Sequence, residues 1–198
     1  MFLHSDANAF YVSCQTAMEP GLIGKPVIVT TNNDGAIAAL NAEAKSLGLK
    51  RGQPLFEIQQ LIREDRIKVF SSNFVLYGDF SARFHTTIGE SVPRHEIYSC
   101  DEVFASLHGM NKIIDYQEFG QKLKAKVFRH TSLVCGIGIA PTKTLCKAAT
   151  WAAKKYPQTH GVVVLDDPAR RDRLLNLLPV SDVWGIGKKL AKRLNEIS

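Results

Sequence analysis

Two short apolar segments, 96–100 (EIYSC) and 103–107 (VFASL), are separated in the sequence by one acidic pair, Asp101 and Glu102. Their length and their β-branched and aromatic content predict two antiparallel strands, with the acidic pair at the tight connection or at its edge. A doubly wound parallel sheet needs strands and helices in regular alternation, and this hairpin breaks the alternation. The chain is therefore predicted to be an α+β protein whose sheet contains antiparallel strands.

The apolar periodicity elsewhere predicts the elements that would complete this sheet. Strands are expected at 1–5 and 133–139, and helices at 8–18, 73–92, 116–130 and 142–155. Residues 19–70 are punctuated by Gly and Pro, which indicates a small inserted sub-structure with strands at 27–30 and 36–39 and a helix at 42–47. The order fits a ferredoxin-like arrangement, a mixed antiparallel sheet with its helices on one face.

Composition excludes several classes of protein. The 198 residues are 45% hydrophobic and 22% charged, unlike a disordered tail or a coiled-coil rod. No apolar stretch approaches a membrane span and the first residues lack the basic region of a signal peptide, so we expect a cytoplasmic protein without a membrane partner. The four cysteines, Cys14, Cys100, Cys135 and Cys146, form no C-x-x-C pair and are predicted to be reduced core residues.

The net charge of +6 is confined to one end of the chain. Residues 1–142 hold 14 Lys+Arg and 14 Asp+Glu, whereas residues 143–198 hold 11 Lys+Arg and 5 Asp+Glu. This asymmetry favours a polyanionic partner, with nucleic acid as the leading candidate. A merely solvated basic surface is the alternative.

Three carboxylates are candidates for metal chemistry. Asp6 follows the first predicted strand, and Asp101 and Glu102 lie between two apolar strands. Taken singly, Asp6 could be a helix N-cap and the acidic pair a solvated turn. Anions at the mouth of a core are costly unless a cation compensates them, and three carboxylates from two strand ends suit a pair of Mg²⁺ ions about 3.5–4 Å apart. Neighbouring strands would let the three meet.

Longer strings carry a resemblance to a known family. They are SDANAFYVSC (5–14), YSCDEVFASL (98–107), GIGIAPTKTLCKAA (136–149) and VWGIGKKLAKRL (183–194). Together they resemble the Y-family, or translesion, DNA polymerases. FSSNFVLYGDFSARF (70–84) and NNDGAIAALNAEAKSLG (32–48) are most similar to its bacterial UmuC branch. The resemblance runs through the whole chain, with its motifs in the family's order.

The resemblance implies error-prone, template-directed DNA synthesis past lesions by two-metal nucleotidyl transfer, as part of SOS-type DNA repair. The positions that match the family's catalytic carboxylates are Asp6, Asp101 and Glu102. Two Mg²⁺ ions, for which Mn²⁺ can substitute, would be bound by these three side chains and by the main-chain carbonyl of Ala7.

The resemblance also implies a binding site for the nucleotide. Phe10 and Tyr11 match an aromatic pair in which the second ring excludes a ribose hydroxyl by collision. The alternative, that both rings belong to the core, suits Phe10 better than Tyr11. Lys45 and Lys143 match positions that contact the triphosphate, and Lys143 lies near a predicted helix N-terminus that favours anions. Lys154 and Lys155 are interpreted as the solvated face of that helix.

Near the C-terminus, Gly185 and Gly187 followed by Lys188 and Lys189 have the form of a helix-hairpin-helix. Glycines let a backbone approach a phosphate closely, and lysines add attraction that is independent of sequence. We therefore expect these four residues to bind DNA. The alternative is a Gly-rich turn before an ordinary basic helix.

The family's organisation implies a palm at 1–18 and 73–160, fingers at 19–72 and the start of a thumb at 161–198, with the little finger absent. Primer–template DNA and dNTPs are the implied partners, together with a UmuD-type subunit, a sliding clamp and a recombinase filament in the full-length protein. Two alternatives stay open. One is a catalytically weak DNA-binding or protein-docking module of the same family, and the other is a nucleotide cyclase, although the G-G-D/E-E-F turn of cyclases is absent.

Overall fold

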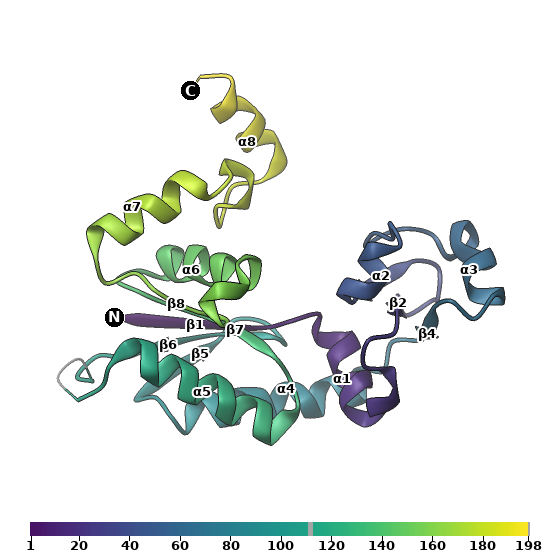
Figure 1. Ribbon diagram of the computed structural model, residues 1–198, viewed down its shortest axis with the longest axis horizontal. Coiled ribbons are helices and arrows are strands. Elements are labelled where there is room, and N and C mark those ends of the chain that lie inside the picture. The colour runs from purple at the N-terminus through teal and green to yellow at the C-terminus, as the bar shows by residue number, and fades with distance from the viewer. Residues whose placement is uncertain (111–112, 198) are drawn as a thin grey trace.

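The structure is a computed structural model that describes residues 1–110 and 113–197. Its strands form two separate sheets (Figure 1). The larger has the order β5-β6-β1-β7-β8, with β1 at Phe2–Ala7, β5 at Arg94–Ile97, β6 at Glu102–Ser106, β7 at Cys135–Ala140 and β8 at Val162–Val164. The smaller has the order β3-β2-β4, with β2 at Val27–Thr30, β3 at Ile37–Leu40 and β4 at Lys68–Phe70.

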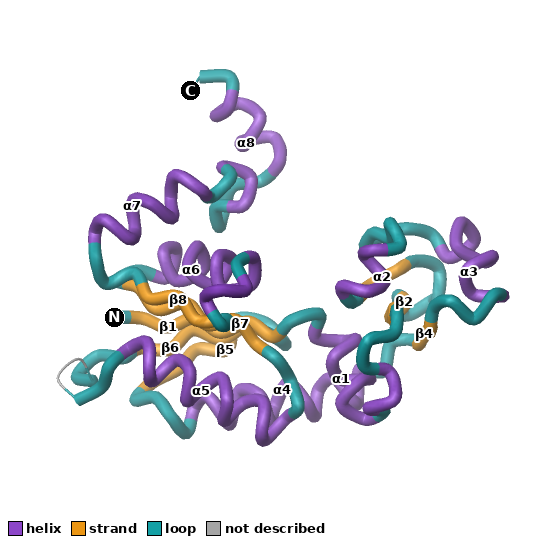
Figure 2. The backbone as a smooth tube through the Cα atoms, in the orientation of Figure 1, coloured by secondary structure: helices purple, strands orange, loops and turns teal. Residues whose placement is uncertain are grey.

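Eight α-helices surround these sheets in the described residues (Figure 2). They are α1 at Phe10–Met18, α2 at Ala42–Ser46, α3 at Gln59–Arg63, α4 at Phe74–Gly89, α5 at Tyr116–Thr131, α6 at Lys143–Lys155, α7 at Pro168–Leu177 and α8 at Lys188–Asn195. Three of the longer ones begin at residues whose side chains accept a backbone N–H, as helix N-caps do: Asn73, Asp115 and Thr142. No described helix combines the length and the apolarity that crossing a membrane requires.

The strand β1 lies at the centre of the larger sheet, antiparallel to both β6 and β7. Alternate side chains point to opposite faces of a strand. Leu3 and Ala7 join the core formed with α4 and α5, whereas His4 and Asp6 contact α6 on the opposite face. The side chain of Asp6 therefore lies on the face of the sheet that α6 covers.

The predicted α+β class is confirmed, but the helices cover both faces of the sheet and not one. The reason lies in β7, which is buried on both faces. A Cβ atom at Gly138 would lie 2.2 Å from the carbonyl oxygen of Cys146, and one at Gly136 would lie 2.9 Å from Cγ of Lys154. These glycines let α6 approach the face of β7 that the prediction left uncovered.

Two strands differ from prediction. The segment 96–100 was predicted to be an apolar strand, but β5 ends at Ile97 and is an edge strand in which all four residues are exposed. The strand β8 was not predicted, and it pairs in parallel with β7. Because β8 completes the larger sheet, that sheet extends to Val164.

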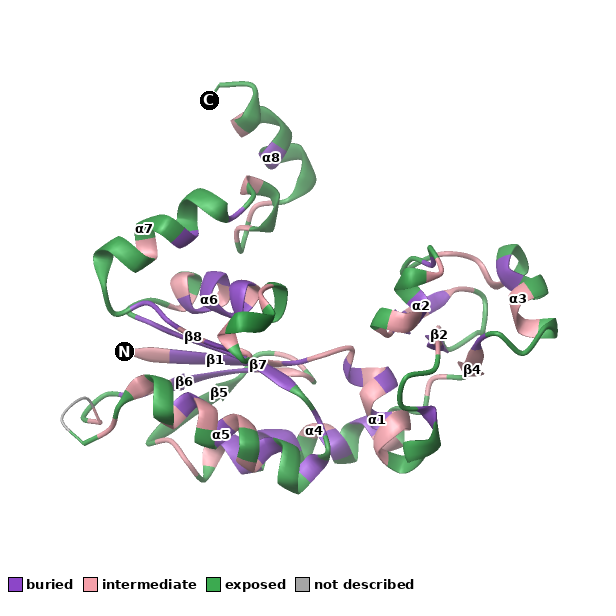
Figure 3. Cartoon of the chain, in the orientation of Figure 1, coloured by how far each residue is buried: buried purple, intermediate pink, exposed green. Residues whose placement is uncertain are grey.

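Residues 19–70 build a hydrophobic core of their own, as the Gly and Pro pattern predicted. Its buried members are Ile28, Ile37, Leu40, Ala44, Leu49, Ile58 and Ile67. Buried residues otherwise concentrate on the larger sheet and on the inner sides of its helices, while α8 is mostly exposed (Figure 3). The two outer parts, α2–α3 with the small sheet and α7–α8, are joined to this central layer (Figure 1).

Candidate active site

Two of the candidate carboxylates face each other across neighbouring strands. Asp6, near the end of β1, is the register partner of Glu102, the first residue of β6. Asp101 directly precedes β6, and its carbonyl accepts a hydrogen bond of 2.9 Å from the backbone N–H of Ala7. The strand pairing thus brings Asp6, Asp101 and Glu102 to one end of the sheet, as neighbouring strands would allow.

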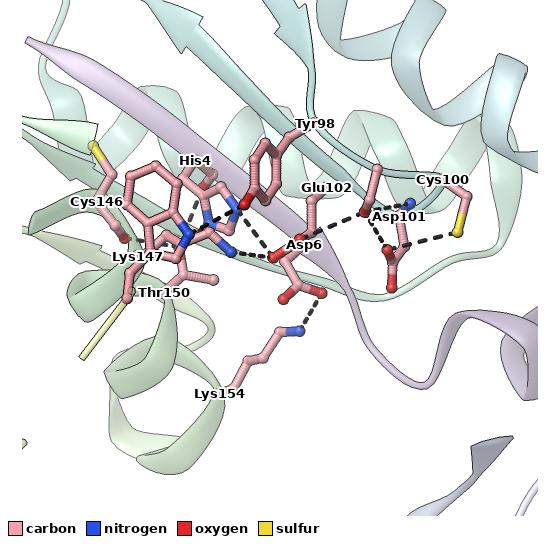
Figure 4. Close-up of polar contacts among 12 residues, drawn as sticks. His4, Asp6, Tyr98, Cys100, Asp101, Glu102, Cys146, Lys147, Thr150 and Lys154 are labelled. Carbon is pink, nitrogen blue, oxygen red and sulfur yellow. Dashed lines mark hydrogen bonds and ion pairs between the residues drawn. The ribbon is translucent and has the colours of Figure 1, made fainter. Parts of the chain in front are cut away.

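Lysines from α6 neutralise two of these carboxylates (Figure 4). Nζ of Lys154 forms an ion pair with Oδ1 of Asp6, and Nζ of Lys147 lies 2.6 Å from Oε1 of Glu102. The two lysines are seven residues apart, about two helical turns, and therefore share the face that covers the sheet. Lys154, interpreted as part of a solvated face, is exposed, but its Nζ also pairs with Asp6 and its stem lies against Gly136 of β7. Lys155 instead lies over the ring of Trp151, 4.4 Å from its centroid.

A buried histidine beneath the carboxylates was missed by sequence reasoning. His4 is 1% exposed, and its Nδ1 is 2.9 Å from Oγ1 of Thr150 on α6. Its Nε2 lies 3.5 Å from Oε1 of Glu102, which is longer than a well-formed hydrogen bond. The His4 contact, aided by Lys147 and opposed by burial, lowers the pKa of Glu102 to about 2. The signal in the sequence was its place two residues before Asp6 on the same face of the strand.

The pKa of Asp6 shifts in the opposite direction to that of Glu102. Burial raises the pKa of its carboxyl, Lys154 opposes the rise, and the charges of Asp101 and Glu102 add to it. The ionised form of Asp6 is therefore held at a cost that a divalent cation would relieve.

The donor atoms here suit Mg²⁺, which prefers carboxylate and carbonyl oxygens. Among residues 1–110 and 113–197, however, no three His, Cys, Asp or Glu side chains already converge on one point that could hold a metal ion. Oδ1 of Asp101 accepts a hydrogen bond of 2.6 Å from Oγ of Ser99, and its side chain points toward Cys100, away from Lys154 (Figure 4).

Tyr11 lines a cavity of about 440 Å³ in front of the carboxylates. Cys100 and Asp101 lie on the same wall, and Thr31 and Arg51 from the inserted segment close the other side. Arg51 also lines the adjacent cavity of about 390 Å³, and sequence reasoning did not single it out. The cavity lined by Tyr11 is thus bordered by one carboxylate, Asp101, and by one cation, Arg51.

The remaining predicted nucleotide contacts fall in different places. Phe10 is buried at 4% exposure, yet it lines the same cavity as Tyr11, and exposed Lys45 lines the second cavity. Lys143 lies apart from the carboxylates, with its Nζ 2.5 Å from Oε2 of Glu96 and 5.1 Å from the centroid of the Phe104 ring. Lys143, which the resemblance assigns to the triphosphate, thus pairs with Glu96, whereas Lys154 is the lysine of α6 that pairs with Asp6.

All four cysteines were predicted to be core residues, and for Cys100 this prediction was wrong. Cys14, Cys135 and Cys146 are buried, but Cys100 is exposed because it lies in the connection beyond the edge strand β5. Its Sγ is 3.7 Å from Oδ1 of Asp101. A thiol therefore borders the cavity.

The glycine-containing loop before α8 contacts the central sheet through an aromatic side chain. Nε1 of Trp184 donates a hydrogen bond of 3.2 Å to the hydroxyl of Tyr98, and its ring lies 5.6 Å from that of Phe104. Lys147 lies over both aromatic rings, 5.0 Å from the Tyr98 centroid and 5.7 Å from the Trp184 centroid. The cation that pairs with Glu102 is thus shared with the loop of the C-terminal part.

That loop has the backbone expected for close approach to a ligand. Gly185 has φ +88°, which favours glycine, and Gly187 is the N-cap of α8 without a side chain of its own. Lys188 and Lys189 are exposed in the first turn of α8.

Comparison with known families places these features in context. The impB/mucB/samB family matches residues 5–151, and the IMS family HHH motif matches residues 168–197. Protein UmuC of Salmonella typhimurium is 48% identical over 198 residues, which cover 100% of this chain and 47% of that protein. Protein MucB of Escherichia coli is 47% identical over 195 residues, covering 98% of this chain and 46% of that protein.

More distant relatives and solved structures also match nearly the whole of this chain. DNA polymerase IV of Pelotomaculum thermopropionicum is 33% identical over 99% of this chain and 48% of that protein. The insertion ternary complex of Dbh DNA polymerase superposes with a TM-score of 0.83 at 27% identity, covering 100% of this chain and 57% of that one. DinB from Sulfolobus solfataricus gives a TM-score of 0.81 at 27% identity, over 99% of this chain and 57% of that one. The chain spans about half the length of the curated relatives it matches.

Proposed function

The chain belongs to the impB/mucB/samB family, the Y-family DNA polymerases, and on that premise we propose that it is the catalytic region of an error-prone polymerase that copies damaged templates. The observation that supports this most directly is the register pairing of Asp6 with Glu102, with Asp101 beside them. Asp101 lines a cavity that Tyr11 also lines. A nucleotide could enter there with its phosphates toward the acidic cluster.

In this proposal Asp6, Asp101, Glu102 and the carbonyl of Ala7 hold two divalent cations, Mg²⁺ by preference. Such a pair stabilises the charge on an attacking and a leaving oxygen. Binding requires Asp101 to turn from Ser99, a hydrogen bond of 2.6 Å that the structure contains. Asp6 would exchange its ion pair with Lys154 for the cation, which releases the lysine Nζ.

The released Lys154 is then the cation best placed to bind a phosphate oxygen of the nucleotide. Lys45, from the opposite side of the space, supplies a second contact to the triphosphate in this proposal. Lys143, paired with Glu96, is assigned a contact with nucleic acid or a structural role instead. Tyr11 lies against the sugar and excludes a ribose hydroxyl by collision.

We assign primer–template DNA to the basic C-terminal part. Gly185, Gly187, Lys188 and Lys189 would bind its phosphates without reading sequence. We propose a palm at 1–18 and 73–165, fingers at 19–72 and a thumb from 166 onward, a boundary chosen because β8 belongs to the larger sheet. A UmuD-type subunit, a sliding clamp and a recombinase filament remain proposed partners of the longer proteins that share this region.

Single-nucleotide incorporation on a primed template tests the proposal. The chain is assayed at low salt with Mg²⁺ and then with Mn²⁺, beside Asp101→Ala and the control Asp79→Ala. Asp79 is an exposed carboxylate on α4 that pairs with Arg83, away from the cluster. We expect Asp101→Ala to lower the rate by about a hundredfold or more, and Asp79→Ala to leave it unchanged.

Other outcomes distinguish the alternatives. If neither the unchanged chain nor Asp79→Ala incorporates nucleotides, but dNTP binding depends on the metal and on Asp101, the site is a nucleotide site that cannot hold DNA without further domains. If dNTP binding depends neither on the metal nor on Asp101, the polymerase proposal fails. DNA binding that persists unchanged in Asp101→Ala would then favour a docking or DNA-binding module of the same family.

A further inference from the structure

The ring of Tyr11 is stacked on a second aromatic residue that no functional motif singled out. The centroids of the Tyr11 and Tyr77 rings are 4.4 Å apart, and the ring planes are inclined by 18°. Tyr11 belongs to α1 and lines the cavity before the carboxylates, whereas Tyr77 belongs to α4 and is 2% exposed. One face of the Tyr11 ring is therefore covered by the core, and the ring still borders the cavity.

Tyr77 is itself fixed in place. Its hydroxyl accepts a hydrogen bond of 3.1 Å from Nε2 of Gln15, which lies one helical turn after Tyr11 on α1. The ring of Phe74 meets both tyrosines edge-on, at 6.3 Å from Tyr11 and 6.1 Å from Tyr77. The stack is thus tied to α1 through the hydrogen bond and to α4 through the backbone of Tyr77, so the two rings move only if the two helices separate.

We propose that Tyr77 is the positioning residue that holds the Tyr11 ring across the sugar site, and that it thereby sets the preference for deoxyribonucleotides over ribonucleotides. This inference rests on the proposed function. Exclusion by collision works only while the ring cannot rotate away, since a free side chain would move aside for a hydroxyl. Aromatic stacking of this kind changes a population ratio by about two- to tenfold. The stack is therefore large enough to matter for discrimination.

The test compares variants of Tyr77 with a matched core variant. Tyr77→Leu removes the stack, Tyr77→Phe keeps the ring and removes the hydroxyl, and Phe80→Leu alters a neighbouring buried aromatic residue on α4 that is 5% exposed. For each protein, kcat/KM is measured with dUTP and with UTP opposite the same template base. We expect Tyr77→Leu to shift the ratio toward UTP by about two- to tenfold, with Tyr77→Phe close to the unchanged chain.

Phe80→Leu controls for loss of stability, because Phe80 belongs to the same core and is not among the described aromatic rings that contact the Tyr11 ring. A shift of equal size in Phe80→Leu would overturn the proposal, since general loosening of α4 would then explain it. An unchanged ratio in Tyr77→Leu, alongside a raised use of UTP in Tyr11→Ala, would also overturn it while leaving the proposed function intact.

A second measurement decides the question if the chain does not incorporate nucleotides. The affinities of dUTP and UTP are measured by calorimetry with Ca²⁺ present, on the same four variants. Preference for dUTP that falls in Tyr77→Leu and persists in Phe80→Leu supports the inference. The same affinity ratio in all variants rejects it.

Discussion

Asp6 and Glu102 face each other on adjacent strands, yet their surroundings act on them in opposite directions. His4 and Lys147 stabilise the anion of Glu102, whereas burial and two neighbouring carboxylates disfavour the anion of Asp6. One carboxylate is therefore electrostatically satisfied without metal and the other is not. This division makes Asp6 the group that gains most from a bound cation.

The first prediction concerns stability without metal. Glu102 has a folded-state pKa of about 2 against an ordinary value of 4.5, so its contribution is present above pH 4.5 and is lost as the pH falls toward 2. Glu102→Gln should lower the free energy of unfolding at pH 7 by about 2 kcal/mol, a loss that shrinks across that window. Urea unfolding in a chelator at several pH values measures it.

Asp6→Asn should behave in the opposite sense in the same measurement. The pKa of Asp6 is raised, so the folded state favours the neutral form and gains stability as the pH falls toward the ordinary value of 3.8. A permanently neutral amide should therefore stabilise the chain at pH 7, and the gain should vanish in acid. Destabilisation by both substitutions at pH 7 would contradict this account of the site.

The second prediction uses two adjacent lysines. Lys154 pairs with Asp6, while Lys155 lies over the rings of Trp151 and Tyr156. Lys154→Met should lower kcat/KM for the nucleotide by about tenfold or more, because a preorganised cation at a phosphate is lost. Lys155→Met should have little effect on kcat/KM. Equal effects of the two substitutions would mean that α6 contributes only its general positive charge.

The residues of this site differ in how far sequence alone could reveal them. Asp6, Asp101 and Glu102 were identifiable because each lies at a strand end, and strand pairing then brings them together. His4 and Lys154 were not, because their roles depend on how closely α6 packs over β1 and β7. Local periodicity carries no information on that packing distance.

At the scale of elements, the contact between α6 and β7 controls the geometry of the site. It places Thr150 against His4 and places two lysines over the carboxylates. The approach is close because Gly138 has no side chain. Moving α6 outward would therefore alter the packing of the core and the charges around Asp6 together.

The third prediction compares two Gly→Ala substitutions. At Gly138 a Cβ would lie 2.2 Å from the Cys146 carbonyl oxygen, so Gly138→Ala should destabilise the chain by about 2 kcal/mol or more. At exposed Gly78, in the interior of α4, nothing lies within 4 Å of such a Cβ. Gly78→Ala should stabilise the chain by about 0.5–1 kcal/mol through helix propensity. Thermal or urea unfolding checks both.

A stable Gly138→Ala variant would show that α6 can retreat from the sheet without cost. In that case the ion pairs of Lys147 and Lys154 with the carboxylates should also lengthen, and metal binding by the same protein should change.

The edge of the sheet explains the errors at this scale. Ile97 and Tyr98 belong to an apolar segment, but Ile97 ends the edge strand β5 and is 60% exposed, and Tyr98 directly follows β5 and is 47% exposed. The three-residue strand β8 is too short for periodicity to identify, and its pairing with β7 depends on a connection through α6. Patterns of hydrophobicity predict a strand more readily than they predict its place in the sheet.

At the scale of the whole molecule, the net charge is distributed unevenly along the chain. The segment 1–142 carries no net charge, and the +6 of the chain lies in residues 143–198, which include α6, α7 and α8. The charge of α8 is exposed, whereas Lys147 and Lys154 on α6 are engaged by carboxylates. Binding to a polyanion should therefore depend chiefly on the C-terminal part.

The fourth prediction follows from that distribution. A fluorescence-anisotropy titration with labelled primer–template should show an affinity that falls steeply with salt. Lys188→Ala combined with Lys189→Ala should reduce the slope of log K against log salt by about 1.5–2. The control pair Lys122→Ala and Arg129→Ala, on the exposed side of α5, should leave the slope unchanged. Equal losses in both pairs would indicate diffuse attraction without a defined binding surface.

Both tryptophans of the chain lie where the C-terminal part meets α6 and the sheet. Nε1 of Trp151 donates a hydrogen bond of 3.0 Å to Oδ2 of Asp182, and Nε1 of Trp184 donates to the hydroxyl of Tyr98. Tryptophan fluorescence of the protein therefore comes only from this contact region between the C-terminal part and the central layer. The unlabelled protein thus carries its own optical reporter of whether α7 and α8 stay in contact with the central layer when a ligand arrives.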